Sequence, residues 1–145
     1  MARDKFGLGR VQRGVNKALI KAISKIGVKA RVHFKDNFNK EGFVDRSLER
    51  WKPRKDFKYK KRSRRKILKK SGDLKKSIRT ITNRGALRAV IVSDMPYSDI
   101  HNEGGTGKSH GTSFNMPQRQ FIGHSEVLDR KVEDIIEREI DSLFI

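Results

Sequence analysis

Residues 11–38 read VQRGVNKALIKAISKIGVKARVHFKDNF, and this stretch decides the fold. Its apolar residues recur at intervals of three and four, which is the period of an α-helix with one buried face. Lys and Arg fill the other faces. The spacing predicts one long helix over residues 10–40. Its apolar stripe consists of Val11, Val15, Ala18, Leu19, Ala22, Ile23, Ile26, Ala30, Phe34 and Phe38.

Two glycines, Gly14 and Gly27, lie inside this helix. Each disfavours a helix by about 1 kcal/mol relative to alanine. An alternative is therefore a pair of shorter helices that meet at Gly27. Gly42 stands where the helical pattern ends, and it is a suitable stop signal.

A second helix is predicted over residues 125–144. Ser125 is a good N-cap, and the acidic Glu126 and Asp129 follow in the first turn, where the helix dipole favours them. The helix carries seven acidic residues against three basic ones. The chain is thus basic in the middle and acidic at the end. This polarity suits head-to-tail contacts between identical subunits, although an ordinary solvated face explains it equally well.

Between the helices, the sequence predicts one strand pair. Residues 74–82 and 87–93 are rich in β-branched residues, and Asn83-Arg84-Gly85 between them has hairpin chemistry. We therefore expect a β-hairpin within residues 73–94.

The two remaining segments lack a sustained period. Residues 43–72 form a predicted basic arm, interrupted by Pro53. From Arg50 to Arg79 there are 16 Lys and Arg residues against two Asp. Residues 95–123 are rich in Gly, Ser and Asn, and we expect a long Gly-rich loop. The fold class is then a single α+β domain over residues 1–145. The N-terminal and C-terminal helices pack on a small antiparallel sheet.

The composition restricts the classes of function. The 145 residues carry a net charge of +18, which favours polyanions or acidic protein surfaces as partners. The absence of cysteine excludes disulfides, thiolate metal sites and cysteine nucleophiles. We expect neither a secretory signal nor a membrane span, and a protein that is soluble in the cytoplasm where it is made.

Three patterns resemble catalytic or binding motifs, but each is weak evidence for such a site. Gly107-Lys108-Ser109 ends like a phosphate-binding loop, but Asn102 stands where that motif needs a glycine. The four histidines form no helical metal-binding pair. Ser98, Asp99 and His101 are too close in sequence for triad geometry. We therefore expect no enzyme activity, catalytic residue, cofactor or metal.

Five short motifs follow one another in a fixed order. Each alone is weak, but together they span the chain from residue 38 almost to its end. They are Phe38-x-x-x-Gly42, Trp51-x-Pro53, Leu68-x-x-Ser71-Gly72-x-Leu74-x-x-Ser77, Tyr97-x-x-x-His101-x-x-Gly104-Gly105, and Pro117-x-Arg119-x-Phe121-Ile122-Gly123.

This order resembles the phage virion morphogenesis family, the tail-completion proteins of tailed phages. Two mild departures are Ser98 for the usual alanine and Ile122 for the usual leucine. The resemblance implies a non-enzymatic subunit of the virion neck or tail end. It implies a ring of identical copies that contacts other neck, connector or tail proteins.

The motif residues themselves have structural interpretations. We expect Gly72 to turn the chain into the first strand, with Leu74 in the core. Tyr97 and His101 would share one face of a helical turn. In an extended segment Pro117, Arg119 and Phe121 would share a side. Phe121 would be anchored, and Arg119 would be free to pair bidentately with a carboxylate. Gly104-Gly105 would open the loop, and Gly123 would free the backbone before the last helix.

The rival hypothesis is a nucleic-acid-binding protein, because Trp51, Phe57 and Tyr59 are interleaved with basic residues. A regulator or enzyme with residues 104–109 as its site is a third class. The basic segment faces either DNA, in non-specific contact, or an acidic neighbour. Its candidate contact residues are Lys58, Lys60, Lys61, Arg62, Arg64, Arg65 and Lys66.

Overall fold

The structure is a computed structural model that describes residues 6–54 and 66–145. It is a mixed α+β fold, as predicted. Helix α1 (Leu8–Lys40) runs unbroken through Gly27, so the two-helix alternative is wrong. The predicted stripe is buried at Ala18, Ala22, Ala30, Phe34 and Phe38. Near the start of the helix the stripe is more exposed, and Val11 is 54% exposed.

Helix α1 ends at Lys40, two residues before the predicted stop signal Gly42. Glu41 takes the left-handed conformation, with φ 51°, and its N–H donates to the Asn37 carbonyl. Gly42 instead begins strand β1 (Gly42–Val44), which pairs antiparallel with β2 (Leu48–Arg50). A Cβ at Gly42 would lie 2.5 Å from the Glu49 carbonyl oxygen, so close strand pairing requires the glycine.

This first hairpin corrects the prediction that an extended arm begins at residue 43. Residues 42–50 pair because Phe43 is buried against α1, and that burial orders the segment. Six of the seven predicted basic contact residues, Lys58 to Arg65, lie outside the described residues. Lys66 is exposed, and its Nζ donates to the Asn39 carbonyl over 3.3 Å.

The predicted strand over residues 74–82 is wrong in its first half. Helix α2 (Asp73–Ser77) precedes β3 (Arg79–Asn83), which pairs with β4 (Arg88–Val92). Gly72 sits at the helix start with φ 77°. A helical turn buries Leu74 and Ile78 together, whereas strand alternation would also bury the charged Lys76.

The predicted Gly-rich loop also contains regular structure. Helix α3 (Ser98–Glu103) leads into β5 (Gly105–Ser109), which pairs with β6 (Thr112–Met116) as a third hairpin. Gly104 joins the two with φ 74°, and a Cβ there would lie 2.8 Å from the Gln118 backbone nitrogen. Gly105 opens a strand rather than a loop. Residues 107–109 are therefore in a strand and do not precede a helix.

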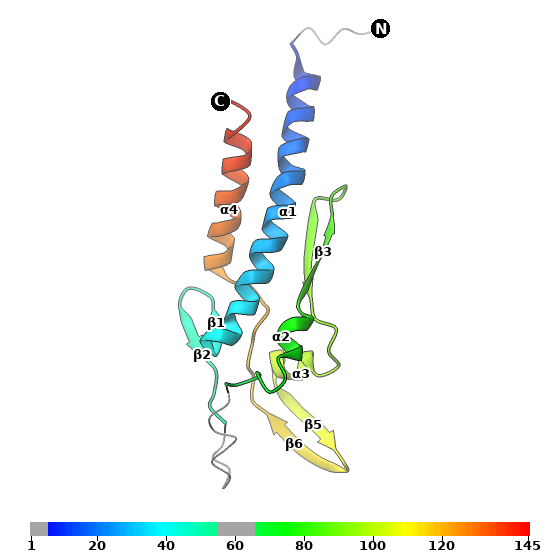
Figure 1. The fold of residues 1–145 in the computed structure, drawn as a ribbon, viewed down its shortest axis with the longest axis vertical. Helices are drawn as coiled ribbons and strands as arrows, with labels where there is room; N and C mark the ends of the chain where they lie inside the picture. The colour runs from blue at the N-terminus through cyan, green and yellow to red at the C-terminus, as the bar shows by residue number, and fades with distance from the viewer. Residues whose placement is uncertain (1–5, 55–65) are drawn as a thin grey trace.

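Helix α4 (Glu126–Asp141) lies beside α1, and Figure 1 shows α1 between α4 and the β3–β4 hairpin. We expected both long helices to cover one sheet. Instead α4 packs mainly on α1, and the described strands form three separate two-stranded sheets. An ion pair between Lys25 and the buried Glu139 joins the helices.

The core consists of two neighbouring clusters. The first contains Phe38, Trp51, Leu74, Ile78 and Phe121. The second is made by Ala30, Phe34, Phe43 and Leu128. Ile91 and Ile122 pack against both, so the core is continuous around the C-terminal half of α1.

Candidate functional site

Residues 119–125 cross the molecule as an extended stretch, called here the junction segment. Its backbone is bonded by other parts of the chain rather than by a sheet. The N–H groups of Phe121 and Ile122 both donate to Asn102 Oδ1, at 2.9 and 3.0 Å. The Arg119 N–H donates to the His101 carbonyl at 2.8 Å. Helix α3 therefore holds one edge of the junction segment.

The carbonyls of the junction segment are bonded by side chains from α1 and from the residue after β2. Trp51 Nε1 donates to the Gln120 carbonyl at 2.7 Å, and Asn37 Nδ2 donates to the Phe121 carbonyl at 3.0 Å. Asn37, which is 0% exposed, also accepts from the Val44 N–H through its Oδ1 at 3.3 Å. One α1 side chain thus joins the helix, the first hairpin and the junction segment.

The segment ends in a buried polar network around Ser125. The Ser125 hydroxyl donates to the Val44 carbonyl at 2.7 Å and accepts from the Leu128 N–H at 3.2 Å, which confirms the predicted N-cap. His33 Nε2 lies 3.1 Å from the same hydroxyl oxygen. Because the hydroxyl proton is already donated, a protonated Nε2 is the tautomer that fits. Burial, and next the charge of Lys131, lower the pKa of His33.

Arg119 does not make the predicted carboxylate pair within the described residues. Its Nε and Nη2 both donate to the Lys52 carbonyl at 3.2 Å. Arg119 and Phe121, which were predicted to share one side of this segment, are both buried, with exposed fractions of 7% and 1%. Burial first, and then the charge of Arg54, lower the pKa of Arg119.

Tyr97 and His101 share a face of α3, as predicted, and their rings meet edge to face with centroids 5.8 Å apart. Burial, followed by the charge of Arg119, lowers the pKa of His101. Its Nδ1 is buried without a hydrogen-bond partner in the described part of the chain.

Several motif residues line one pocket of about 350 Å³, called here the motif pocket. The structure brings Leu74, Tyr97, His101 and Arg119 together there, from α2, α3 and the junction segment. The remaining lining residues are Arg54, Leu68, Lys70, Ser71, Asp73 and Met116.

The other predicted motif residues lie elsewhere. Trp51 is in the core beside Phe38, and Ser77 donates to the Leu74 carbonyl at 2.7 Å. Gly105 is exposed in the third hairpin, and Pro53 is exposed after the first. Half-buried Pro117 and Gly123 flank Arg119 and Phe121 in the chain.

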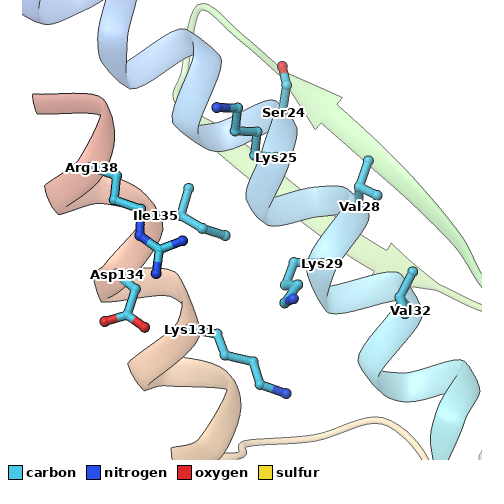
Figure 2. Close-up of a pocket in the computed structure, with 9 residues that line it drawn as sticks. All are labelled: Ser24, Lys25, Val28, Lys29, Val32, Lys131, Asp134, Ile135 and Arg138. Atoms are coloured by element: carbon cyan, nitrogen blue, oxygen red, sulfur yellow. The ribbon is translucent and has the colours of Figure 1, made fainter. Parts of the chain in front are cut away.

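A second concave surface lies between α1 and α4. Figure 2 shows the residues that line this groove on the two helices, and Val28 and Val32 are 53% and 56% exposed. The rim is mostly basic. The full lining is Ser24, Lys25, Val28, Lys29, Val32, Lys131, Asp134, Ile135 and Arg138. A solvated apolar strip with a charged rim is typical of a protein contact surface.

Sequence reasoning missed three polar residues that organise the site: His33, Asn37 and Asn102. Each bonds or lies beside backbone far away in sequence, such as Phe121 for Asn37. A signal existed for Asn37, because it is a polar residue beside Phe34 and Phe38 on a buried helix face. Asn102 lies inside the fourth motif and carried no such signal.

Within residues 6–54 and 66–145 there is no group of three acidic or histidine side chains placed to hold a metal ion. In the same residues no helix is long and apolar enough to cross a membrane.

Comparisons with known proteins agree with the motif order. The model of the phage virion morphogenesis family matches residues 8–141, which is nearly the whole chain. No curated protein and no solved structure matches. The match spans α1, the motif pocket, the junction segment and α4. The chain therefore belongs to the phage virion morphogenesis family, and its role is in the structure and assembly of the phage particle.

Proposed function

We propose that the protein is a tail-completion subunit that forms a ring at the head–tail junction and contacts neighbouring neck, connector or tail proteins. It acts through shape and packing, without catalysis. The observation that carries the proposal is the family match over residues 8–141, in which the family's motif residues organise the junction segment.

The surfaces support a role in protein contact. Exposed apolar side chains gather where α1 begins and after α4 ends, with Leu8 at 65%, Val11 at 54% and Phe144 at 75% exposed. The α1–α4 groove adds Val28 and Val32. Such residues would be covered in a ring, where each copy presents one surface to a different surface of the next.

A gene deletion in the phage that encodes the protein tests this directly. We expect electron micrographs of the lysate to show DNA-filled heads beside detached tails, or tails of abnormal length. Supplying the protein from a plasmid should restore complete particles. Intact, infectious particles in the deletion lysate would refute the tail-completion role.

Direct nucleic-acid binding is the second candidate, and the basic composition favours it. Non-specific contact with roughly 6–10 phosphates should weaken about 10³–10⁵-fold between 50 and 200 mM salt, without sequence preference. A dedicated DNA-binding protein should keep affinity and preference at physiological salt. Filter binding with two unrelated duplexes over this salt range separates the two cases.

A further inference from the structure

Arg119 is a buried cation without a described carboxylate partner. Its side chain is 7% exposed, and two of its nitrogens share a single acceptor, the Lys52 carbonyl. Within the described residues its Nη1 donates to the Met116 sulfur, a weak acceptor, at 4.0 Å. The ion pairs among residues 6–54 and 66–145 do not include Arg119. Burying a charge without an opposite charge beside it is unfavourable. A carboxylate from a protein partner would offset this and so stabilise the complex.

The motif pocket suits such a partner. Arg54, Lys70 and Arg119 contribute three cations against the single carboxylate of Asp73. His101 adds a buried Nδ1 that lacks a hydrogen-bond partner among the described residues. The remaining wall includes Leu68, Leu74, Tyr97 and Met116, and its apolar surface fits the methylene groups of an acidic side chain. The guanidinium fork matches a carboxylate in two parallel hydrogen bonds.

We infer that the motif pocket binds a carboxylate from the acidic face of α4 in a second copy of the chain. The chain carries net charge +18, yet α4 holds seven of its 17 acidic residues against three basic ones. Glu133 and Glu137 are exposed one turn apart on that helix. The contact joins two different surfaces, so it can repeat from copy to copy and close into a ring. It rests on the proposed ring function and specifies its interface.

A protein carboxylate fits this pocket better than a DNA phosphate. Duplex DNA presents its phosphates along a broad, stiff backbone, which reaches exposed cations first. Arg119 is instead buried in a concave pocket with apolar walls. A single Glu side chain can enter such a space.

The test uses two full-length variants. Each weakens one of the two surfaces that form the contact, the motif pocket or the acidic face of α4. Lys70→Glu changes the pocket, and Glu133→Gln/Glu137→Gln removes two charges from α4 without adding cations that could pair with the new Glu; all three residues are exposed. Sedimentation velocity should show that the wild-type protein self-associates and that each variant alone does so at least about ten-fold more weakly. An equimolar mixture should form a heterodimer, because it retains one intact pocket and one intact α4. The mixture should grow no further, because the other two surfaces are spoiled.

The matched control is Lys76→Glu, a charge reversal at an exposed residue of α2 that does not line the pocket. It should associate like wild type, and circular dichroism should show native folding for every variant. A wild-type protein that stays monomeric, a Lys70→Glu variant that associates normally, or a mixture without heterodimer would overturn the inference. Loss of DNA binding by Lys70→Glu with unchanged association would assign the pocket to nucleic acid instead. If the deletion still blocks tail joining in these cases, the proposed function stands and only this interface fails.

Discussion

The two ends of α1 are stabilised in different ways. Around Phe34, Asn37 and Phe38 the helix is buried, and side chains bond the backbone of segments distant in sequence. Around Leu8 and Val11 the same helix carries apolar residues that are 65% and 54% exposed. The difference indicates that the C-terminal part of α1 holds the subunit together, while its first turns contribute little to the packing of the subunit.

The largest effect should come from removing Phe121, which is 1% exposed and lies 5.1 Å from the Phe38 ring centroid. Phe121→Ala leaves a cavity in the first core cluster and should lower the free energy of unfolding by about 3–5 kcal/mol. Urea denaturation followed by circular dichroism measures it. The control Val11→Ala, at the exposed end, should change stability by less than about 0.5 kcal/mol. Equal losses of stability at Phe121 and Val11 would contradict the difference between the two ends of α1.

Asn37 tests the polar part of the same comparison. Asn37→Ala leaves the Phe121 carbonyl and the Val44 N–H without this partner, and each buried, unsatisfied group costs about 1–3 kcal/mol. We expect a loss of about 2–4 kcal/mol in the free energy of unfolding, again from urea curves. Asn16→Ala, on the exposed part of α1, is the matched control and should be neutral or slightly stabilising. A neutral Asn37→Ala would show that the junction segment does not depend on this side chain.

The two helix glycines sharpen the comparison. A Cβ at Gly27 would lie 2.7 Å from Thr80 Cγ2, and the Thr80 hydroxyl donates to the Gly27 carbonyl at 2.9 Å. Gly27→Ala should therefore destabilise the protein by about 1–2 kcal/mol, because the β3–β4 hairpin must move away.

At Gly14 an added Cβ would make only an ordinary contact with the described residues outside its own helix turn, to Leu143 Cδ2 at 3.8 Å. Gly14→Ala should therefore stabilise by about 0.5–1 kcal/mol, through helix propensity alone. Thermal unfolding of the two variants shows whether each substitution raises or lowers the stability. A gain at both positions would mean that the hairpin does not rest on Gly27.

The smallest effect concerns pH. The pKa of His33 is lowered in the folded state, so near and below pH 6.5 the unfolded chain binds a proton that the folded chain does not. Stability should then be fully present above about pH 6.5 and fall as the pH decreases below it. His33→Gln should show a shallower decline in urea midpoint between pH 7.5 and 5. A residual slope is expected, because the pKa of His101 is lowered too. If the urea midpoint of His33→Gln declines as steeply with falling pH as that of the wild type, His33 does not contribute to the pH dependence.

Local patterns predicted the two long helices and the β3–β4 pairing well, because helical period and strand composition are properties of consecutive residues. They failed for Asp73–Ser77 and Gly105–Met116. In the first case, the burial of Leu74 and Ile78 selects a helical turn within a segment that has strand neighbours. In the second case, the glycine-rich composition is typical of a loop. Pairing between the two strands nevertheless satisfies the hydrogen-bonding groups of the backbone.

The sequence suggested some residues of the candidate site, but not the polar residues that organise it and not its geometry. Arg119 and Phe121 were correctly placed on one side of an extended segment, and Tyr97 and His101 on one helical face. The acceptor for Arg119 could not be predicted, since the Lys52 carbonyl is 67 residues away in the chain. Long-range pairing depends on how all elements pack, and no local pattern records it.

By itself, the sequence determined the α+β class, the two long helices, the Ser125 cap and the family. Each follows from residues that are close in the chain or from motifs in a fixed order. Only the tertiary structure decided that Asn37, Asn102 and Trp51 bond the junction segment, and that Arg119 is buried beside His101 without a described carboxylate. The physical reason is that buried polar groups must find partners wherever packing places them, whatever their separation in the chain.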